Sequence, residues 1–262
     1  MCTIIAIHRL REDLPLVVAA NRDEFLDRPA SGPRLLQHSP PALGGIDLER
    51  GGTWMAASAH GFFVGLTNQR PSRPQQPAPR SRGELVLEAL ATGSIHRAMG
   101  LIHQLDTRQY NAFNLLIGDG ERLYVVYLRP DRPVERTELG PGLHVLTNDR
   151  MGSPHFPKAR RARTLVEPLI SLPWPMLAHG LQRVLADHHL PDPGQLPALP
   201  PGLPLPPEVA LQLQALCIHL PRYGTRSSTL LALEPGRLLH YLYAEGKPCE
   251  VAFEDRMGLL ET

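Results

Sequence analysis

The sequence predicts a single α+β domain over residues 1–262, with largely antiparallel sheets and helices packed on their outer faces. Runs with β-strand patterning come in adjacent pairs near both ends of the chain, and helical spacing lies between them. This order differs from the regular alternation of a doubly wound parallel fold. A chain of 262 residues with a 42% hydrophobic fraction is also long enough to bury a core without disulfides or a structural metal.

The first half of the chain predicts three β-hairpins. Residues 2–8 and 16–20 are short apolar runs rich in β-branched side chains, joined by a charged segment. A turn centred on residues 12–13 places Cys2 opposite Asp23. The second and third hairpins join residues 53–59 to 62–68 and residues 115–118 to 123–128, through turns at His60-Gly61 and Asp119-Gly120.

Helices are predicted where apolar residues recur at helical spacing. The segment over residues 83–105 breaks near Gly93, and Ser94 is the expected N-cap of its second part. The chain then returns to strands near its end. Two further helices are expected over residues 158–170 and 176–190, followed by strands over residues 225–233, 238–244 and 249–253.

Proline is unusually frequent in this chain. The 28 prolines are about twice the usual share of roughly 5%. They cluster near residues 71–79 and 191–207, which we predict to be loops because proline fits neither a helix interior nor a central strand. The second loop is interpreted as an insertion, a domain linker or a substrate lid. In an interaction module it would act as a polyproline ligand for a partner.

Composition and charge exclude several classes of function. Lys and Arg number 27 against 26 Asp and Glu, so no field attracts nucleic acid or an anionic bilayer non-specifically. No run of about 18 apolar residues is present, and the apolar start is too short for a signal-peptide core. We therefore expect no integral membrane association and a cytoplasmic location. The sequence does not indicate an oligomeric state.

The spacing of cysteines and histidines predicts neither a disulfide framework nor a metal site. The three cysteines are Cys2, Cys217 and Cys249, an odd number at spacings that match no zinc pattern. Among the twelve histidines, His188 and His189 are adjacent, so their side chains diverge. The chain also lacks the glycine patterns of phosphate and dinucleotide loops. No cofactor is expected.

Cys2 is the strongest candidate for a catalytic nucleophile. Removal of Met1 would leave it with both a thiol and a free α-amino group. An α-amino group has a pKa of roughly 7.7–8.0 against about 8.5 for a thiol, so one residue would then carry nucleophile and base together. The alternative is that Cys2 is a small buried hydrophobic residue at the start of a strand.

A dense polar cluster follows the second predicted strand. The expected hairpin places Asn21, Arg22, Asp23 and Glu24 beside Cys2. Asp23 would orient the terminal amine, while Arg22 would lower the pKa of the thiol or bind an anionic substrate. Since strand side chains alternate, Asn21 and Asp23 should share one face and Arg22 should point away. The alternative is a solvated turn with no function.

A short motif that occurs twice places an asparagine at the end of each of two predicted strands. Leu66-Thr67-Asn68 is followed by Gln-Arg, and Leu146-Thr147-Asn148 by Asp-Arg. Each copy follows an apolar run, so each asparagine is expected at a sheet edge where polar side chains can collect. Asparagine also ends strands for purely structural reasons, which is the alternative for either copy alone.

Three other polar segments carry weaker hypotheses. Residues 222–229 begin a predicted strand with two arginines, Arg222 and Arg226, either of which would clamp a carboxylate or phosphate. Residues 51–54 form a glycine turn where backbone can approach a ligand. The basic run over residues 158–163 is interpreted as the solvated face of a helix, with phosphate binding as the alternative.

Taken together, these residues resemble the NRDE family, also called the transport and Golgi organisation family. The matching segments occur in order from residue 2 to residue 229, so the resemblance covers most of the chain. They are the Met-Cys start and residues 21–24, 51–54, 65–70, 111–116, 147–148 and 223–229.

That family in turn resembles the N-terminal-nucleophile hydrolases, in particular the choloylglycine hydrolase and acyl transferase branch. The resemblance implies a four-layer αββα sandwich and a set of catalytic residues. In that branch an arginine lies three residues before the aspartate, whereas this chain has Ala20 there. Either Arg22 or Arg226 takes the place of that arginine, or the nucleophile is activated in another way. The implied catalytic residues are Cys2 as nucleophile, Asp23 as the nearby acid, Asn68 and Asn148 around the oxyanion and amine, and Arg226.

The leading hypothesis is an N-terminal cysteine amidohydrolase or acyl transferase that acts on a small amide or thioester. The substrate-binding residues expected beside Cys2 are Asn21, Arg22, Trp54 and Arg70. The alternative is a non-catalytic carrier on the same fold that holds a lipid, an acyl-coenzyme A or haem. In that case Cys2 would serve as an axial thiolate ligand of haem.

Overall fold

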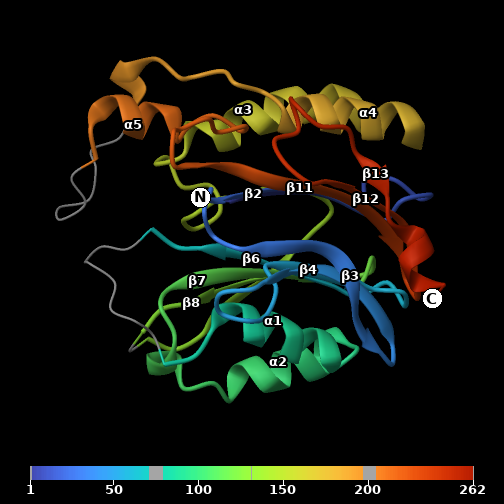
Figure 1. Ribbon diagram of the computed structural model, residues 1–262. Coiled ribbons are helices and arrows are strands. Elements are labelled where there is room, and N and C mark those ends of the chain that lie inside the picture. Colours follow the sequence, from blue (N-terminus) through green and yellow to red (C-terminus); the bar gives the residue numbers. More distant parts are fainter. Residues whose placement is uncertain (1, 71–78, 131, 197–204, 262) are drawn as a thin grey trace.

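The computed structural model describes residues 2–70, 79–130, 132–196 and 205–261, which form four layers. A six-stranded and a seven-stranded sheet lie face to face, and helices cover the outer face of each (Figure 1). Every strand pair in both sheets is antiparallel. The predicted α+β class is confirmed, as is the αββα arrangement that the family resemblance implies.

One sheet combines strands from both ends of the chain. Its central strands are buried on both faces because helices cover one side and the second sheet covers the other, so they lack a polar face. The strand order is β10-β1-β2-β11-β12-β13. The strands are β1 (Thr3–His8), β2 (Leu16–Phe25), β10 (Gly142–Leu146), β11 (Tyr223–Glu234), β12 (Arg237–Ala244) and β13 (Glu254–Asp255).

The other sheet is a meander in which each strand pairs with the next along the chain. The second and third predicted hairpins are both present in it. Their turns contain Gly61 at φ 71° and Gly120 at φ 90°, a conformation that favours glycine. The strands are β3 (Ala30–His38), β4 (Pro41–Asp47), β5 (Met55–Ser58), β6 (Phe63–Asn68), β7 (Phe113–Gly118), β8 (Leu123–Leu128) and β9 (Glu135–Leu139).

Helices form the two outer layers. Ser94 caps its helix as predicted, because its hydroxyl accepts a hydrogen bond from Arg97 N. None of the helices in the described ranges is long and apolar enough to cross a membrane. Helices α1 (Arg82–Ala91) and α2 (Ile95–His103) lie on the seven-stranded sheet, and α3 (Pro157–Val166), α4 (Trp174–Leu185) and α5 (Pro207–Gln212) lie on the other side.

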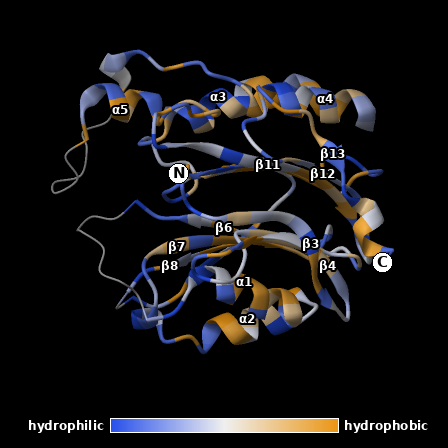
Figure 2. Ribbon diagram, in the orientation of Figure 1, coloured by the Kyte–Doolittle hydropathy of each residue, from blue (hydrophilic) through white to orange (hydrophobic). Residues whose placement is uncertain are grey.

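Three apolar layers hold the sandwich together. One lies between α1, α2 and the seven-stranded sheet, one between the two sheets, and one between the six-stranded sheet and α3 and α4. Figure 2 shows hydrophobic residues along the strands of both sheets and on α1, α2 and α4. The site described below opens at the edge of the middle layer, where the chain begins.

The first predicted hairpin is present, but its predicted register is wrong by one residue. When the observed pairing is continued one position beyond β1, it sets Cys2 level with Arg22 instead of Asp23. The loop over residues 9–15 has an odd length, so its centre falls on one residue rather than between two. Because strand side chains alternate, this shift moves Cys2 to the face of Arg22.

Other differences concern segments without a clear local pattern. The strand expected over residues 249–253 is wrong: a turn closed by a hydrogen bond from Glu250 N to Lys247 O takes its place, and only β13 follows. The helix predicted over residues 158–170 ends at Val166, because Pro168 interrupts it. Strands β3, β4 and β9 and helix α5 were not predicted, whereas β10 is the strand expected before Asn148.

Parts of the two proline-rich loops lie outside the described residues. The parts left out are residues 71–78 of the first loop and 197–204 of the second. In the described remainder of the second loop, Pro193–Gln195 form a 3-10 turn and α5 begins at Pro207. Proline suits such a helix start because the first turn needs no hydrogen-bonded N–H there.

Candidate active site

Cys2 lies between the two sheets, at the beginning of β1. The N-terminal label in Figure 1 marks this position. Ile4 and Ala6 belong to the apolar layer between the sheets, and by strand alternation Cys2 continues their face. The Cys2 side chain is half-buried, and its Sγ lies 4.0 Å from the carbonyl oxygen of Asp23. Cys2 is therefore placed at the edge of the core.

A cavity of about 270 Å³ opens beside Cys2. Its walls come from β1, β2, the loop before β5, the end of β6 and the start of α1. The volume is close to the lower end of the roughly 300–1,000 Å³ usual for small-molecule sites. Four of the residues predicted from the sequence line it together: Cys2, Arg22, Trp54 and Asn68.

Arg22 is held against an aromatic ring in the cavity wall. Its guanidinium carbon lies 4.4 Å from the centre of the Trp54 ring, within the range of a cation–π contact. The Trp54 ring occupies the space that a side chain at Gly45 would need. Ring and guanidinium are thus pre-positioned, and Arg22 points away from Asn21 and Asp23 as predicted.

Arg82 contributes a second guanidinium at the start of α1. Its Nη1 is buried and has no hydrogen-bond partner among the described residues. Burial lowers the pKa of the Arg82 guanidinium, and the charge of Glu24 opposes this effect. An Arg guanidinium stays charged at neutral pH, so an anionic ligand would supply the missing partner.

The glycine turn ahead of β5 docks on this same helix start. Gly52 has φ 81°, and a side chain there would overlap the backbone of Gly83. A hydrogen bond of 3.1 Å from Thr53 N to Gly83 O joins the two segments. The close approach expected of this turn is therefore made to the start of α1, which shapes the cavity wall.

The two Leu-Thr-Asn copies meet where the sheets approach each other. The Thr67 hydroxyl donates to Thr147 O at 2.7 Å, and Asn148 Nδ2 donates to Asn68 O at 2.5 Å. Asn114 supports the junction, since its amide donates to the Thr67 hydroxyl and to Thr147 O. The predicted gathering of polar side chains is present. Asn68 lines the cavity, whereas Asn148 supports it through the Asn68 backbone.

Asp23 is buried on the opposite face of β2. The Thr225 hydroxyl donates to its Oδ1 at 2.7 Å, and Lys158 Nζ lies 3.8 Å from its Oδ2. Burial raises the pKa of the Asp23 carboxyl and lowers the pKa of the Lys158 amine, while each partner opposes the shift of the other. A contact between the two residues joins the Cys2 sulfur to the Asp23 backbone oxygen, while the Asp23 carboxylate lies on the other face of β2 with Thr225 and Lys158.

The Asn21 side chain has a structural role, because its hydrogen bonds join neighbouring elements. Its Nδ2 donates to Leu185 O at 2.9 Å and to Leu216 O at 2.8 Å, and its Oδ1 accepts from the Ser228 hydroxyl. These bonds join β2 to the end of α4 and to β11. The side chain shares the face of Asp23, as strand alternation predicts, and faces away from the cavity at Cys2.

Two predicted arginines lie away from the cavity. Arg70 stacks on Phe156, with its guanidinium carbon 4.7 Å from the ring centre. Arg226 is the extra residue of a β-bulge, because Thr225 pairs with Asp23 and the next pair joins Ser227 to Arg22. Neither is among the described residues that line the cavity.

Sequence reasoning missed two residues that shape this site. Lys158 belongs to a basic run expected to be a solvated helix face, yet it is 1% exposed. The sequence pattern could have indicated this burial, because Lys158, Ala162 and Val166 share the buried face of α3 at helical spacing. Arg82 gave no such signal, since its role follows from the position of α1 against the glycine turn.

Thiol chemistry in this cavity requires a base. Burial raises the pKa of the Cys2 thiol, so the sulfur carries its proton at neutral pH. The α-amino group exposed by removal of Met1 would belong to Cys2 itself and would accept this proton. The cavity thus combines a thiol, an amide side chain at Asn68 and guanidinium groups for an anion.

Comparison with known proteins identifies relatives along most of the chain. The family model described as Transport and Golgi organisation 2 matches residues 1–244. A Transport and Golgi organization protein 2 homolog of Bos taurus is 30% identical over 232 residues, covering 84% of this chain and 82% of the relative. The homolog of Homo sapiens is 29% identical over 231 residues with the same coverage.

Solved structures with a similar fold are bile acid hydrolases. A cysteine-to-alanine mutant of conjugated bile acid hydrolase from Clostridium perfringens gives a TM-score of 0.52 at 13% identity, over 98% of this chain and 93% of that one. An arginine-to-leucine variant of that hydrolase gives 0.52 at 11% identity, over 97% and 92%. At such low identity the similarity shows that the chain and this hydrolase share a fold, and no more.

Proposed function

The chain belongs to the Transport and Golgi organisation 2 family, and we propose that it is an N-terminal cysteine hydrolase or acyl transferase. Its substrate is a small amide or thioester that carries an anionic group. The observation that carries the proposal is the placement of Cys2, at the chain start, on the wall of a cavity with Asn68 and Arg22. A buried structural cysteine would not need this access.

The proposed reaction uses Cys2 after Met1 has been removed. The α-amine of Cys2 takes the thiol proton, and the sulfur attacks the substrate carbonyl to form a tetrahedral intermediate. The Asn68 amide and backbone N–H groups stabilise the oxyanion, a role that contributes roughly 2.7–4 kcal/mol per donor in hydrolases. Collapse breaks the C–N or C–S bond, the leaving group takes the proton from the ammonium, and an acyl-thioester remains on Cys2.

Release of the acyl group repeats these steps with a second nucleophile. The α-amine takes a proton from water, and the resulting hydroxide attacks the thioester carbonyl. The C–S bond then breaks, the Cys2 sulfur takes the proton back from the ammonium, and a carboxylic acid is released. An amine or thiol acceptor in place of water would give an acyl transferase. Asp23 and Asn148 are positioning residues in this scheme, because Asp23 meets Cys2 through its backbone oxygen and the Asn148 side chain donates to the backbone oxygen of Asn68.

The charge of the cavity supports an anionic substrate. Five arginines line it, against three acidic residues. Arg28 is paired with Asp47 at 2.8 Å and Arg80 is paired with Glu88, whereas Arg22 rests on Trp54 and Arg82 retains a buried unpartnered nitrogen. A carboxylate or phosphate near Arg22 and Arg82 would place a neighbouring carbonyl beside Cys2.

Processing and thiol reactivity test the proposal directly. Intact mass spectrometry separates protein that retains Met1 from protein that begins at Cys2. Each form is pulsed with sub-stoichiometric iodoacetamide, the labelled peptide is identified, and turnover of N-acyl amino acids and acyl thioesters is measured. We expect the processed form alone to turn over substrate, with Cys2 labelled ahead of Cys217 and Cys249. Equal turnover by both forms contradicts the amine mechanism.

Arg82→Gln should weaken binding of charged substrates specifically. Loss of a charged hydrogen bond costs about 1.5–3 kcal/mol, so KM for a carboxylate-bearing substrate should rise roughly 10- to 150-fold. The KM for its methyl ester should change little. Arg183→Gln, on the exposed face of α4, is the matched control. An equal KM increase for acid and ester would show that Arg82 supports the fold of the cavity instead of binding charge.

A further inference from the structure

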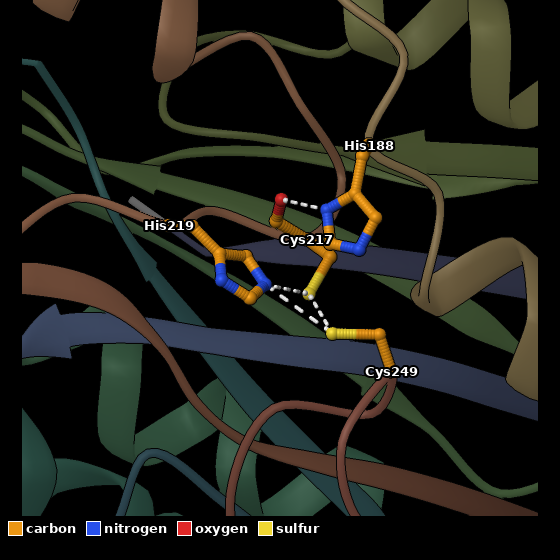
Figure 3. Close-up of side chains that lie close together, drawn as sticks. All are labelled: His188, Cys217, His219 and Cys249. Atoms are coloured by element: carbon orange, nitrogen blue, oxygen red, sulfur yellow. Dashed lines mark hydrogen bonds between the residues drawn. The ribbon is translucent and has the colours of Figure 1, made fainter.

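Four potential metal ligands gather on the outer side of the six-stranded sheet, away from the cavity at Cys2. They are His188, Cys217, His219 and Cys249, and their ligand atoms all lie within 4.8 Å of one another (Figure 3). They come from three segments: the chain after α4, the chain before β11 and the loop after β12. Spacing along the sequence predicted no metal site, because it detects only ligands that are close in sequence.

Among Cys217, His219 and Cys249, two of the three ligand-atom distances match those of a tetrahedral zinc site and the third is shorter. Cys217 Sγ lies 3.7 Å from Cys249 Sγ and 3.6 Å from His219 Nε2, and the Nε2 lies 3.2 Å from Cys249 Sγ. Zinc with Zn–S near 2.3 Å and Zn–N near 2.0–2.1 Å sets two sulfurs about 3.8 Å apart and a sulfur and nitrogen about 3.6 Å apart. The two free thiols are too distant for a disulfide of about 2.05 Å.

The protein also fixes which nitrogen of each histidine faces the cluster. His188 Nδ1 lies 3.2 Å from Cys217 O, so it donates to the backbone and leaves Nε2 without its proton as a ligand. His219 Nδ1 lies 3.7 Å from Glu250 Oε1, while its Nε2 faces both sulfurs. Backbone carbonyls and carboxylates orient metal-binding histidines in this way.

We propose that His188, Cys217, His219 and Cys249 bind one zinc ion. Two thiolates and two imidazoles in a tetrahedral arrangement favour zinc over the oxygen-preferring cations. Binding forms two Zn–S and two Zn–N bonds, releases one proton from each cysteine to solvent and involves no oxidation. Four protein ligands fill the coordination sphere, which is typical of a structural site. Cys217 is buried, and the other three ligands are exposed, so the ion can enter from solvent.

The proposed zinc ion would link the two ends of a long segment of the chain. His188 precedes the proline-rich segment over residues 191–207 and Cys217 follows it, and Cys217 N already donates to Asp187 O at 2.9 Å. Next to Cys217, Ile218 N donates to the Thr225 hydroxyl that in turn donates to Asp23. The ion would hold both ends of the proline-rich segment together. It would also stiffen the chain at Ile218, which is linked to Asp23 through the Thr225 hydroxyl.

Zinc and cobalt binding to the full chain test this proposal. Protein treated with a chelator is titrated with zinc chloride by calorimetry, and with cobalt(II) by absorption spectroscopy. We expect one equivalent of zinc with Kd below about 1 μM. Cobalt should give thiolate charge-transfer absorption together with the visible bands of tetrahedral coordination. Melting temperature should rise when zinc is restored.

Variants at the exposed ligands identify the site. Cys249→Ser and His219→Gln should each weaken zinc binding at least about 100-fold, the upper end of the effect of losing an outer-shell partner. His189→Gln, at the exposed histidine next to His188, is the matched control and should bind like wild type. Circular dichroism confirms that each variant is folded. If Cys249→Ser fails to fold, His219→Gln and the wild-type cobalt spectrum still test whether these residues bind zinc.

Four results would overturn the proposal. Three concern metal binding: the absence of stoichiometric zinc binding by reduced protein, a cobalt spectrum without thiolate bands, and zinc affinity unchanged in both ligand variants. A Cys217–Cys249 disulfide in natively purified protein, detected as the loss of two hydrogens in its mass, would also overturn it. The proposal is independent of the hydrolase mechanism, because none of these measurements uses turnover.

Discussion

Protein carrying Cys2→Ala should lose turnover of its acyl substrate by roughly 10⁴-fold or more, since no other group in the cavity replaces the nucleophile. Cys2→Ser should retain a small fraction of the activity, because the processed serine would keep both a hydroxyl and the α-amine. Turnover by purified, mass-verified proteins provides the measurement. The fold should be unaffected, since Cys2 is half-buried at the chain start.

The same two variants distinguish a hydrolase from a non-catalytic ligand carrier. A non-catalytic carrier of a lipid, an acyl-coenzyme A or haem would bind its ligand with no acyl-enzyme, and Cys2→Ala would at most change affinity or the haem Soret band. Wild-type turnover in both variants contradicts the nucleophile role. Trapping of a covalent acyl group on Cys2, seen as a mass increase of the N-terminal peptide, would support it.

Lys158→Met should destabilise the protein by about 3–5 kcal/mol. The Asp23 and Lys158 side chains are both fully buried and lie 3.8 Å apart, so the substitution leaves a buried carboxylate without its cation. Chemical denaturation of wild type and variant provides the measurement. Arg160→Met, two positions along the same helix but exposed, is the matched control and should change stability by less than about 0.5 kcal/mol.

The pH dependence of this loss identifies its cause. Burial raises the pKa of Asp23, and removal of the cation raises it further. A carboxyl whose folded pKa exceeds its unfolded pKa stabilises the fold while protonated, and this contribution is lost as pH rises through the folded value. The destabilisation should therefore shrink as pH falls toward the usual aspartate range near about 4. A loss that is constant with pH would indicate a packing defect alone.

Removing both buried charges at once provides a further test of the ion pair between Asp23 and Lys158. The double variant Asp23→Asn, Lys158→Met should be more stable than Lys158→Met alone, because no unpaired charge then remains buried. Additive losses in the double-variant cycle would show that the two side chains do not interact. Since Asp23 lies beside Cys2, the stability measurements come before any interpretation of activity in these variants.

Much of the fold follows from local patterns in the sequence. The hairpins of β5–β6 and β7–β8 are marked by apolar runs around glycine turns, and the Ser94 cap by its place before an apolar repeat. Strand β9 was missed because it is largely exposed and carries no alternation of apolar residues. Strands β3 and β4 were missed because bulges interrupt their pairing.

The candidate site was predictable in part. Cys2, Arg22, Trp54 and Asn68 were singled out by residue type, by position at strand ends and by the family resemblance, and the structure brings all four to one cavity. Whether they perform the proposed chemistry stays a prediction. Arg70 and Arg226 match the family pattern as well, yet they lie elsewhere, because a pattern in sequence does not fix the direction of a side chain.

The sequence by itself determined the α+β class, three of the hairpins, the family and the identity of Cys2 as the residue to test. Tertiary structure alone decided the one-residue register that turns Cys2 toward Arg22, the burial of Lys158 against Asp23 and the meeting of His188, Cys217 and Cys249. The physical reason is distance along the chain. Hydrophobic periodicity and turn chemistry act over a few neighbouring residues, whereas register, burial and ligand clusters depend on which distant segments pack together.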